Sequence, residues 1–296
     1  MTRIAILGAG AWGSALGATL SEAGHVVTFW RRGEGFDLLG EAEIALVSVP
    51  AGATREVLSA AAPPPGLPLV LTAKGVEPGT LALQTEIAAD AAPGRPAAVL
   101  SGPGFAGDLT RGLPTAVTLA CADAALGARL QAALATPSLR PYLSDDPVGV
   151  QLGGALKNVI AIGCGAAMGA GLGESARAAP VSRGFAEMTR LATALGARAE
   201  TLAGLSGLGD LVLTATSAQS RNYAFGLAVG QGTDPAALAA DGRTYEGART
   251  AGAAVALAER AGVEMPIART VAGLVAGRLT VPEAVATLFN RPLRRE

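Results

Sequence analysis

Near its N-terminus the chain carries the turn Gly8-Ala9-Gly10-Ala11-Trp12-Gly13, directly after an alternating aliphatic run at Arg3–Gly8. A helical pattern at Trp12–Glu22 follows, and a second β-rich run begins at His25. In a strand–turn–helix–strand unit the glycines permit a tight turn, and the helix N-terminus then faces a pyrophosphate. The spacing alone is weak evidence in a chain with 40 glycines, where a plain tight turn is the alternative. Its context therefore predicts a dinucleotide site at this turn.

The first half of the chain alternates β-rich runs with helical patterns, which is typical of a parallel α/β sheet. The predicted strands are Arg3–Gly8, His25–Arg31, Ile44–Val49, Leu69–Ala73, Ala97–Leu100 and Ala116–Ala120. The predicted helices are Trp12–Glu22, Thr54–Ala61 and Leu81–Ala89. We expect a Rossmann-type α/β domain with a mostly parallel sheet over residues 1–146.

From Asp145-Asp146-Pro147 onward only helical periodicity follows, and these three residues are a good helix start. The predicted helices are Val148–Met168, Ser175–Leu195, a helix from Thr201, Asn222–Gly230, Asp234–Ala240, Thr244–Ala261, Met265–Ala276 and Val281–Phe289. Residues 147–296 are therefore expected to form an all-α substrate and catalytic domain.

Composition narrows the class of protein. The net charge is −1 without a basic block, which argues against a nucleic-acid partner. The apolar run Val148–Leu172 is interrupted by polar residues and favours a buried helix over a membrane span. Cys121 and Cys164 lie far apart without metal-ligand spacing, which fits buried thiols in a reducing cytoplasm.

The end of the second predicted strand reads Phe29-Trp30-Arg31-Arg32. An acidic residue at this place binds the ribose 2′-hydroxyl of NAD, whereas arginine suits the 2′-phosphate of NADP. Arg31 and Arg32 therefore favour NADP(H), unless they are only a solvated strand end. Glu34 and Asp37 nearby leave NAD(H) open.

Titratable side chains with catalytic potential are few. The single histidine, His25, starts the second strand, away from the edge where such sheets bind ligands, so we expect it to cap a turn. Among 23 basic residues only Lys74 and Lys157 are lysines, the type that can lose a proton when burial lowers its pKa. Lys74 follows a strand, and Lys157 lies in an apolar helix one turn after Gly153-Gly154. The alternatives are a loop lysine on the surface and a lysine that extends to solvent.

A polar run, Thr214–Asn222, follows Gly207-Leu208-Gly209-Asp210 and leads into a helix. Hydroxyl groups, one arginine and helix N-terminal amides together suit a phosphate. Helix capping by serine and threonine is the alternative.

At these residues the sequence resembles the bacterial NAD(P)-dependent sn-glycerol-3-phosphate dehydrogenases over almost its whole length. The motifs that carry the resemblance are the Gly8–Gly13 turn, Thr72–Gly75, Ser101–Ala106, Gly149–Gly163, Gly207–Leu211, Gln219–Asn222, Tyr245–Gly247 and Gly262–Ile267. The family interconverts glycerol 3-phosphate and dihydroxyacetone phosphate, mainly to supply glycerophospholipid backbones. The resemblance also implies a homodimer, which the family commonly forms.

The resemblance also implies roles for single residues. Lys157 would exchange the proton on the substrate C2 oxygen, Lys74 and Asn158 would orient that oxygen, and Asp210 would support both lysines. Substrate phosphate would contact Ser220, Arg221 and Asn222, with Gly102 and Gly104 lining the site. The cofactor would contact the glycine turn with Trp12, and also Arg31, Arg32, Lys74, Ala106, Arg221 and Glu246. Two lysines and an aspartate suffice for this chemistry without a metal.

The chain departs from the family pattern at two places. Only 11 residues, Gly33–Glu43, separate Arg32 from the next strand, where family members usually carry several tens more, including a helix and a short strand. We therefore expect one strand to be missing and the adenine side of the site to be trimmed. Gly104 also stands where the family often has threonine or serine.

Two other functions remain open from the sequence. A β-hydroxyacid dehydrogenase also carries a lysine and an asparagine in a glycine-rich helix, but its reaction does not require the phosphate-binding group Ser220-Arg221-Asn222. A protein that senses NADPH without turnover would need neither lysine.

Overall fold

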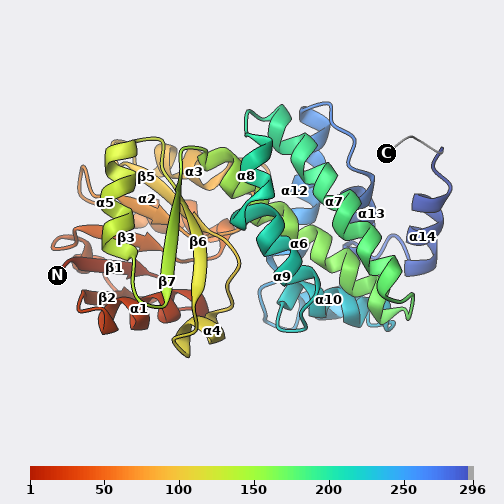
Figure 1. The fold of residues 1–296 in the computed structure, drawn as a ribbon, viewed down its shortest axis with the longest axis horizontal. Coiled ribbons are helices and arrows are strands. Elements are labelled where there is room, and N and C mark those ends of the chain that lie inside the picture. The colour runs from red at the N-terminus through yellow and green to blue at the C-terminus, as the bar shows by residue number, and fades with distance from the viewer. Residues whose placement is uncertain (293–296) are drawn as a thin grey trace.

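Seven strands form one sheet in the N-terminal half of the computed structural model, which describes residues 1–292 (Figure 1). The strands are β1 (Arg3–Leu7), β2 (Val26–Trp30), β3 (Ile44–Val47), β4 (Leu69–Leu71), β5 (Ala97–Ser101), β6 (Thr115–Ala120) and β7 (Leu139–Ser144). Their order is β2-β1-β3-β4-β5-β6-β7, and every neighbouring pair is parallel except β5 and β6. The prediction of a mostly parallel Rossmann-type sheet is confirmed.

Helices cover both faces of the sheet because its central strands are apolar on both sides. One face packs against α1 (Ala11–Glu22) and α5 (Ala124–Leu134), and the other against α2 (Thr54–Ala61) and α3 (Gln84–Ala91). A short helix, α4 (Ala106–Thr110), follows β5 and lies against α1.

The segment between β2 and β3 contains no strand. It forms only the short 3₁₀ turn η1 (Asp37–Leu39), whose Leu39 is buried against the sheet. Strand β2 is therefore the edge of the sheet. This agrees with the expectation that the short segment removes one strand.

Sequence patterns missed three N-terminal elements, α4, α5 and β7. Pro141 lies inside β7, and a proline argues against a central strand. It is tolerated because β7 is the other edge of the sheet, pairing only with β6. Helix α5 had a usable signal, since the side chain of Asp123 caps its first turn.

Several predicted boundaries are displaced by one to three residues, and α3 and β4 are two examples. Helix α3 begins at Gln84 and not at Leu81, which has a left-handed φ of 62° in the preceding loop. Strand β4 ends at Leu71, so Thr72 and Ala73 belong to the loop that carries Lys74.

Helices alone make up the described part of the C-terminal half (Figure 1). They are α6 (Pro147–Gly169), α7 (Glu174–Ala194), α8 (Ala199–Ala203), the π-helical turn η3 (Leu205–Gly209), α9 (Asp210–Ala215), α10 (Arg221–Gly230), α11 (Pro235–Ala239), α12 (Glu246–Arg260), α13 (Pro266–Val275) and α14 (Val281–Phe289). The boundary expected at residue 146 stays a prediction, and Asp146 caps the first turn of α6.

Helix α6 is the central element of this helical part. It packs against α7, α9, α10, α12 and α13 and is buried along most of its length. By length and composition it could cross a membrane, but it forms the interior of the helical domain, as the interrupted apolar run predicted. Small residues allow close packing: a Cβ on Gly165 would lie 2.1 Å from the Tyr223 carbonyl oxygen of α10.

Two further expectations concern residues away from the site. His25 was expected to cap a turn, but its Nδ1 instead accepts a hydrogen bond from the Thr2 backbone N–H at 3.2 Å, so this histidine ties down the start of β1. Cys121 and Cys164 are buried, free thiols.

Candidate active site

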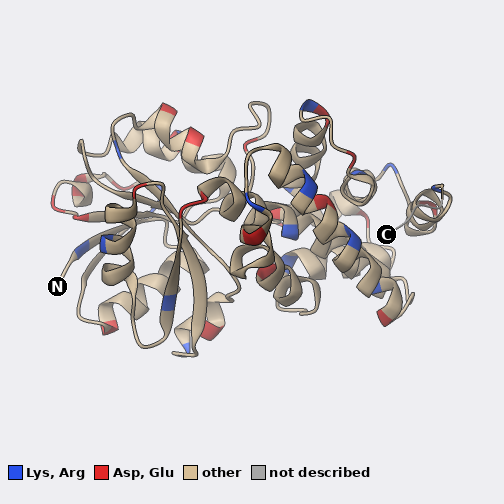
Figure 2. Ribbon diagram, turned by 45° about the horizontal axis from the view of Figure 1, so that its top comes forward, with Lys and Arg blue, Asp and Glu red and all other residues tan. Residues whose placement is uncertain are grey.

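The carboxyl ends of β3, β4 and β5 face the helical domain, and the predicted site residues gather there. Lys74 follows β4, and Gly102 follows β5. Lys157 and Asn158 lie in the middle of α6, and Asp210 is the first residue of α9. Acidic and basic residues are otherwise scattered over both halves in Figure 2, so individual side chains define the site.

One carboxylate joins the two lysines. Lys74 Nζ donates to Asp210 Oδ2 at 2.7 Å, and Lys157 Nζ lies 3.0 Å from Asp210 Oδ1. Lys74 Nζ also donates to the Gly102 carbonyl oxygen at 2.9 Å. Asp210 and Lys157 are almost fully buried, with exposures of 1% and 6%. The cluster therefore links both domains and carries one net positive charge when both lysines are protonated.

The electrostatics of this cluster favour proton exchange by Lys157. Burial, opposed by Asp210 and assisted by the nearby Lys74 charge, lowers the pKa of Lys157 to about 8. Burial works to raise the pKa of Asp210, but the two ammonium groups outweigh it and hold that pKa below its usual value. Lys157 can thus carry or release a proton near neutral pH while Asp210 stays ionised.

Thr214 is a member of this cluster that the sequence did not identify. Lys157 Nζ donates to Thr214 Oγ1 at 2.7 Å, and Thr214 Oγ1 donates to Asp210 Oδ1 at 3.1 Å. The sequence grouped Thr214 with the polar run before α10, but it lies on α9 and faces α6. Its spacing of four residues from Asp210, one helical turn, was the available signal.

Each ammonium group keeps one N–H for a ligand. A lysine has three donors, and two are used at Lys74, by Asp210 and Gly102, and two at Lys157, by Asp210 and Thr214. This is the arrangement needed to stabilise negative charge on an oxygen atom.

A buried chain of side-chain amides runs beside the lysines. Asn158 Nδ2 donates to the carbonyl oxygens of Gly154 at 3.2 Å and Lys74 at 3.4 Å. Asn222 Nδ2 donates to Asn158 Oδ1 at 2.9 Å, and Asn222 Oδ1 accepts from the Gly247 N–H at 2.9 Å. These contacts bring Asn158 and Asn222 together and connect α6, α10 and α12.

The polar run ends at the start of α10. Ser220 caps this helix, its Oγ accepting from the Tyr223 N–H at 3.2 Å, and Arg221 and Asn222 occupy the first turn. Because Asn222 contacts Asn158, this helix N-terminus adjoins the residue next to Lys157. The arrangement fits both capping and the binding of an anion.

The glycine turn has the shape that a dinucleotide requires. Gly8 has φ +110°, and a Cβ there would lie 2.6 Å from the Ser48 carbonyl oxygen. A Cβ on Gly13 would lie 2.2 Å from the Gly8 carbonyl oxygen, whereas one on Gly10 would meet nothing within 4 Å. The backbone is therefore tightly packed beneath the turn and open above it. Gly10 precedes α1 without any side-chain cap, which leaves the N–H groups of the first turn for a ligand.

Other predicted cofactor contacts lie around this turn. The Trp12 ring lies against Gly104, where a Cβ would be 3.3 Å from Trp12 Cη2, and Ala106 begins α4 just beyond. Glu246 Oε1 accepts from the Ala51 N–H after β3 at 3.4 Å, and burial raises the pKa of this carboxyl group. Trp12, Gly104, Ala106 and Glu246 thus lie along the carboxyl edge of the sheet.

Arg31 and Arg32 immediately follow β2 and are exposed. They lie at the β2 end of this edge, far from Lys74, which follows β4, and from Lys157, which lies on α6. The structure therefore separates them from the cluster and keeps them next to the glycine turn, because the Gly8 N–H donates to the Trp30 carbonyl oxygen at 3.1 Å.

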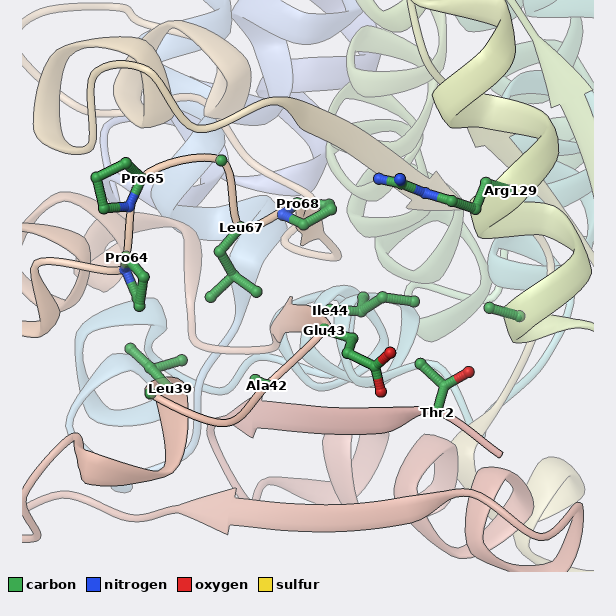
Figure 3. Close-up of a pocket in the computed structure, with 13 residues that line it drawn as sticks. Thr2, Leu39, Ala42, Glu43, Ile44, Pro64, Pro65, Leu67, Pro68 and Arg129 are labelled. Carbon is green, nitrogen blue, oxygen red and sulfur yellow. The ribbon is translucent and has the colours of Figure 1, made fainter.

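A cavity of about 480 Å³ lies elsewhere, and Figure 3 shows its lining. Thr2, Glu43, Ile44 and Pro68 surround it, at the amino ends of β1, β3 and β4. No predicted site residue lines it. Sheets of this class bind their ligands at the carboxyl ends of the strands, so the lysine cluster is the better candidate for the active site.

The Rossmann-type sheet, its glycine turn and the two lysines on one buried carboxylate together define a two-domain nicotinamide-dependent dehydrogenase. Residues 3–35 and 35–127 match the N-terminal family model, and residues 146–286 the C-terminal one, of "NAD-dependent glycerol-3-phosphate dehydrogenase". The chain belongs to this family of oxidoreductases.

Individual relatives agree with this assignment. The glycerol-3-phosphate dehydrogenase [NAD(P)+] of Cereibacter sphaeroides is 52% identical over 310 residues, covering 99% of this chain and 100% of the relative. The Caulobacter vibrioides enzyme is 47% identical over 326 residues, covering 99% and 98%. The crystal structure of the Coxiella burnetii enzyme superimposes with a TM-score of 0.93 at 35% identity, covering 98% and 99%.

The comparisons also locate the missing segment. The match to the N-terminal family model is interrupted at residue 35, inside the short segment after Arg32. The alignment with the Caulobacter enzyme spans 326 positions, although this chain has 296 residues. The chain therefore lacks residues that relatives carry between β2 and β3.

Proposed function

We propose that this chain interconverts sn-glycerol 3-phosphate and dihydroxyacetone phosphate with NAD(P) as cofactor. The observation that carries the proposal is the buried Lys74–Asp210–Lys157 cluster beside the carboxyl edge of a dinucleotide-type sheet. The names of the curated relatives point to the same reaction.

When bound, the nicotinamide supplies the hydride that reduces the C2 carbonyl carbon of the substrate. Lys157 is the proton donor to the C2 oxygen in reduction and the proton acceptor in oxidation, which its pKa of about 8 permits. The remaining N–H of Lys74 stabilises negative charge that develops on the same oxygen. Asp210 holds both ammonium groups in place, and Thr214 fixes the direction of Lys157.

The substrate phosphate is assigned to the N-terminus of α10. Ser220 and Arg221 contribute a hydroxyl and a guanidinium group, and one N–H of Asn222 remains beyond its bond to Asn158. Asn158 uses both of its donors on backbone oxygens. It therefore serves this substrate by orienting the Lys74 loop and Asn222, and it offers the ligand only a remaining acceptor site. Gly102 and Gly104 are assigned to the lining of the substrate site.

For the cofactor, the assigned contacts are the first turn of α1 and Trp12, with Ala106, Lys74, Arg221 and Glu246 toward the nicotinamide end. Arg31 and Arg32 are assigned to the ribose 2′-position. We favour NADP(H) and also expect NAD(H) to be used, as the relatives' names indicate.

The test is NADPH oxidation with three classes of acceptor. We expect turnover with dihydroxyacetone phosphate and none with β-keto acids or unphosphorylated dihydroxyacetone. Turnover of a β-keto acid in preference would favour the β-hydroxyacid dehydrogenase alternative. NADPH binding without turnover of any acceptor would favour a sensor and refute the proposed reaction.

We further propose a homodimer whose product supplies glycerophospholipid synthesis, since the family resemblance implies both, and a cytoplasmic location, which fits the buried free thiols of Cys121 and Cys164. Light scattering of the purified protein measures the mass, and a monomer at working concentrations would contradict the dimer.

A further inference from the structure

The short segment after β2 folds into a turn that holds a carboxylate in a fixed place. Glu34 N donates to the Arg31 carbonyl oxygen at 3.0 Å, and Gly33 has a left-handed φ of 93°. The Glu34 side chain returns to the strand end, where its Oε2 accepts from the Arg31 N–H at 2.7 Å. Its charge therefore lies at the first residue beyond β2.

Aromatic packing supports this turn. The Trp30 Nε1 donates to the Glu34 carbonyl oxygen at 3.0 Å. The Trp30 ring stacks on Phe36 with centroids 4.8 Å apart and planes inclined by 14°. Leu39 is buried just after it. Although Glu34 is exposed, its backbone is anchored on both sides, so its carboxylate is restrained.

This is the place where a dinucleotide fold reads the ribose 2′-position. A carboxylate at the end of β2 accepts the 2′-hydroxyl of NAD, and arginine there pairs with the 2′-phosphate of NADP. The chain has both chemistries within four residues, since Arg31 and Arg32 immediately precede the Gly33-Glu34 turn. The hydrogen bond from the Gly8 N–H to the Trp30 carbonyl oxygen puts this strand end beside the glycine turn.

We propose that Glu34 sets the balance between the two cofactors. Its carboxylate accepts the 2′-hydroxyl of NAD(H) and repels the 2′-phosphate of NADP(H), which Arg31 and Arg32 attract. Dual use of cofactors thus follows from opposing charges on one short turn, and Glu34 is the group that limits NADP(H) affinity. This inference rests on the proposed function only for the use of a nicotinamide dinucleotide.

Calorimetric binding of two adenosine half-ligands to the full chain without cofactor tests the inference. Adenosine 2′,5′-bisphosphate carries the 2′-phosphate, and 5′-AMP carries the 2′-hydroxyl. For Glu34→Gln we expect the bisphosphate to bind about tenfold more tightly, since one negative charge beside a dianion in a solvent-exposed site is removed. We expect 5′-AMP to bind several-fold more weakly, because a charge-assisted hydrogen bond is lost.

Asp37→Asn is the matched control. It removes the same charge three residues away, on η1, without touching the Arg31 N–H. We expect it to change both affinities less than twofold. The gain in Glu34→Gln should shrink between 0.05 and 0.5 M salt, as the Debye length shortens from about 14 to about 4 Å.

Three results would overturn the inference. They are unchanged affinities in Glu34→Gln, an equal effect in Asp37→Asn, and failure of the wild-type chain to bind either half-ligand. In turnover assays, Glu34→Gln should raise the ratio of kcat/KM for NADPH to that for NADH, and Arg31→Ala should lower it. Because the half-ligands contain no nicotinamide, their affinities test the role of Glu34 independently of whether dihydroxyacetone phosphate is the substrate.

Discussion

Neutralising Asp210 should move the pKa of Lys157 and with it the pH dependence of catalysis. Asp210→Asn keeps the shape of the side chain but removes the charge that faces Lys157 Nζ at 3.0 Å. At an effective dielectric constant of about 20, such a contact is worth on the order of 5 kcal/mol. We expect roughly half of this to appear, because the hydrogen bond to Thr214 remains and the site relaxes. The pKa of Lys157 should then fall from about 8 to roughly 6.

The assay is the pH profile of kcat/KM for dihydroxyacetone phosphate, which reports the free enzyme. Reduction requires protonated Lys157, so activity should fall as pH rises through its pKa. In the wild type this limb should lie at about 8, and in Asp210→Asn at roughly 6. At pH 7 the protonated fraction then drops from about nine-tenths to about one-tenth, a loss of roughly tenfold before any loss of positioning.

Lys74→Met gives a shift of the opposite sign. The positive charge of Lys74 lowers the pKa of Lys157, so its removal should move the limb above pH 8. This variant also keeps the reasoning testable if Asp210→Asn folds poorly, since an unpaired buried charge costs about 3–5 kcal/mol. A limb that stays at pH 8 in both variants would refute the electrostatic role given to Asp210.

Three further predictions concern the stability of the fold and the binding of the cofactor. The pKa of Lys157 is lowered in the folded state, so the unfolded chain binds more protons between pH 8 and 10.5. The free energy of unfolding of the wild type, measured with denaturant relative to Lys157→Met, should therefore rise by about 3 kcal/mol over this range. A difference that does not change with pH would contradict this. Glu187→Ala should cost about 2–4 kcal/mol of stability while leaving kcat within twofold, because it orphans two N–H groups at the start of α13; an unchanged melting temperature would count against this. Gly104→Ser should weaken NADPH binding several-fold by displacing the Trp12 ring, and tighter binding in fluorescence titration would show that the site tolerates the family's hydroxyl.

Local sequence patterns predicted most of the helices and strands because the burial of each element leaves a hydrophobic pattern in its own residues. The glycine turn, the aliphatic strands and the apolar α6 each depend on neighbours in the sequence. Strand β7 was missed because Pro141 obscured its alternation, and only its edge position makes this proline acceptable.

The site was predictable in its residue types and not in its contacts. Two lysines among 23 basic residues drew attention, but Lys74 and Asp210 are 136 positions apart, and no local pattern joins them. Family resemblance supplied that pairing. The sequence analysis named Thr214 and Glu34 but not their contacts, because the bond of Thr214 to Lys157 is set by tertiary packing and the turn of Glu34 lies in a segment in which this chain differs from its relatives.

The measurement that tests the central claim most directly is turnover by Lys157→Ala, with cofactor binding measured on the same sample. Lys157 is the group that we assign to exchange the C2 oxygen proton, because burial lowers its pKa to about 8. We therefore expect a loss of kcat of at least about a hundredfold for dihydroxyacetone phosphate reduction, with the Kd for NADPH within about threefold of wild type. Turnover near the wild-type rate would contradict the assignment of Lys157 as the proton donor.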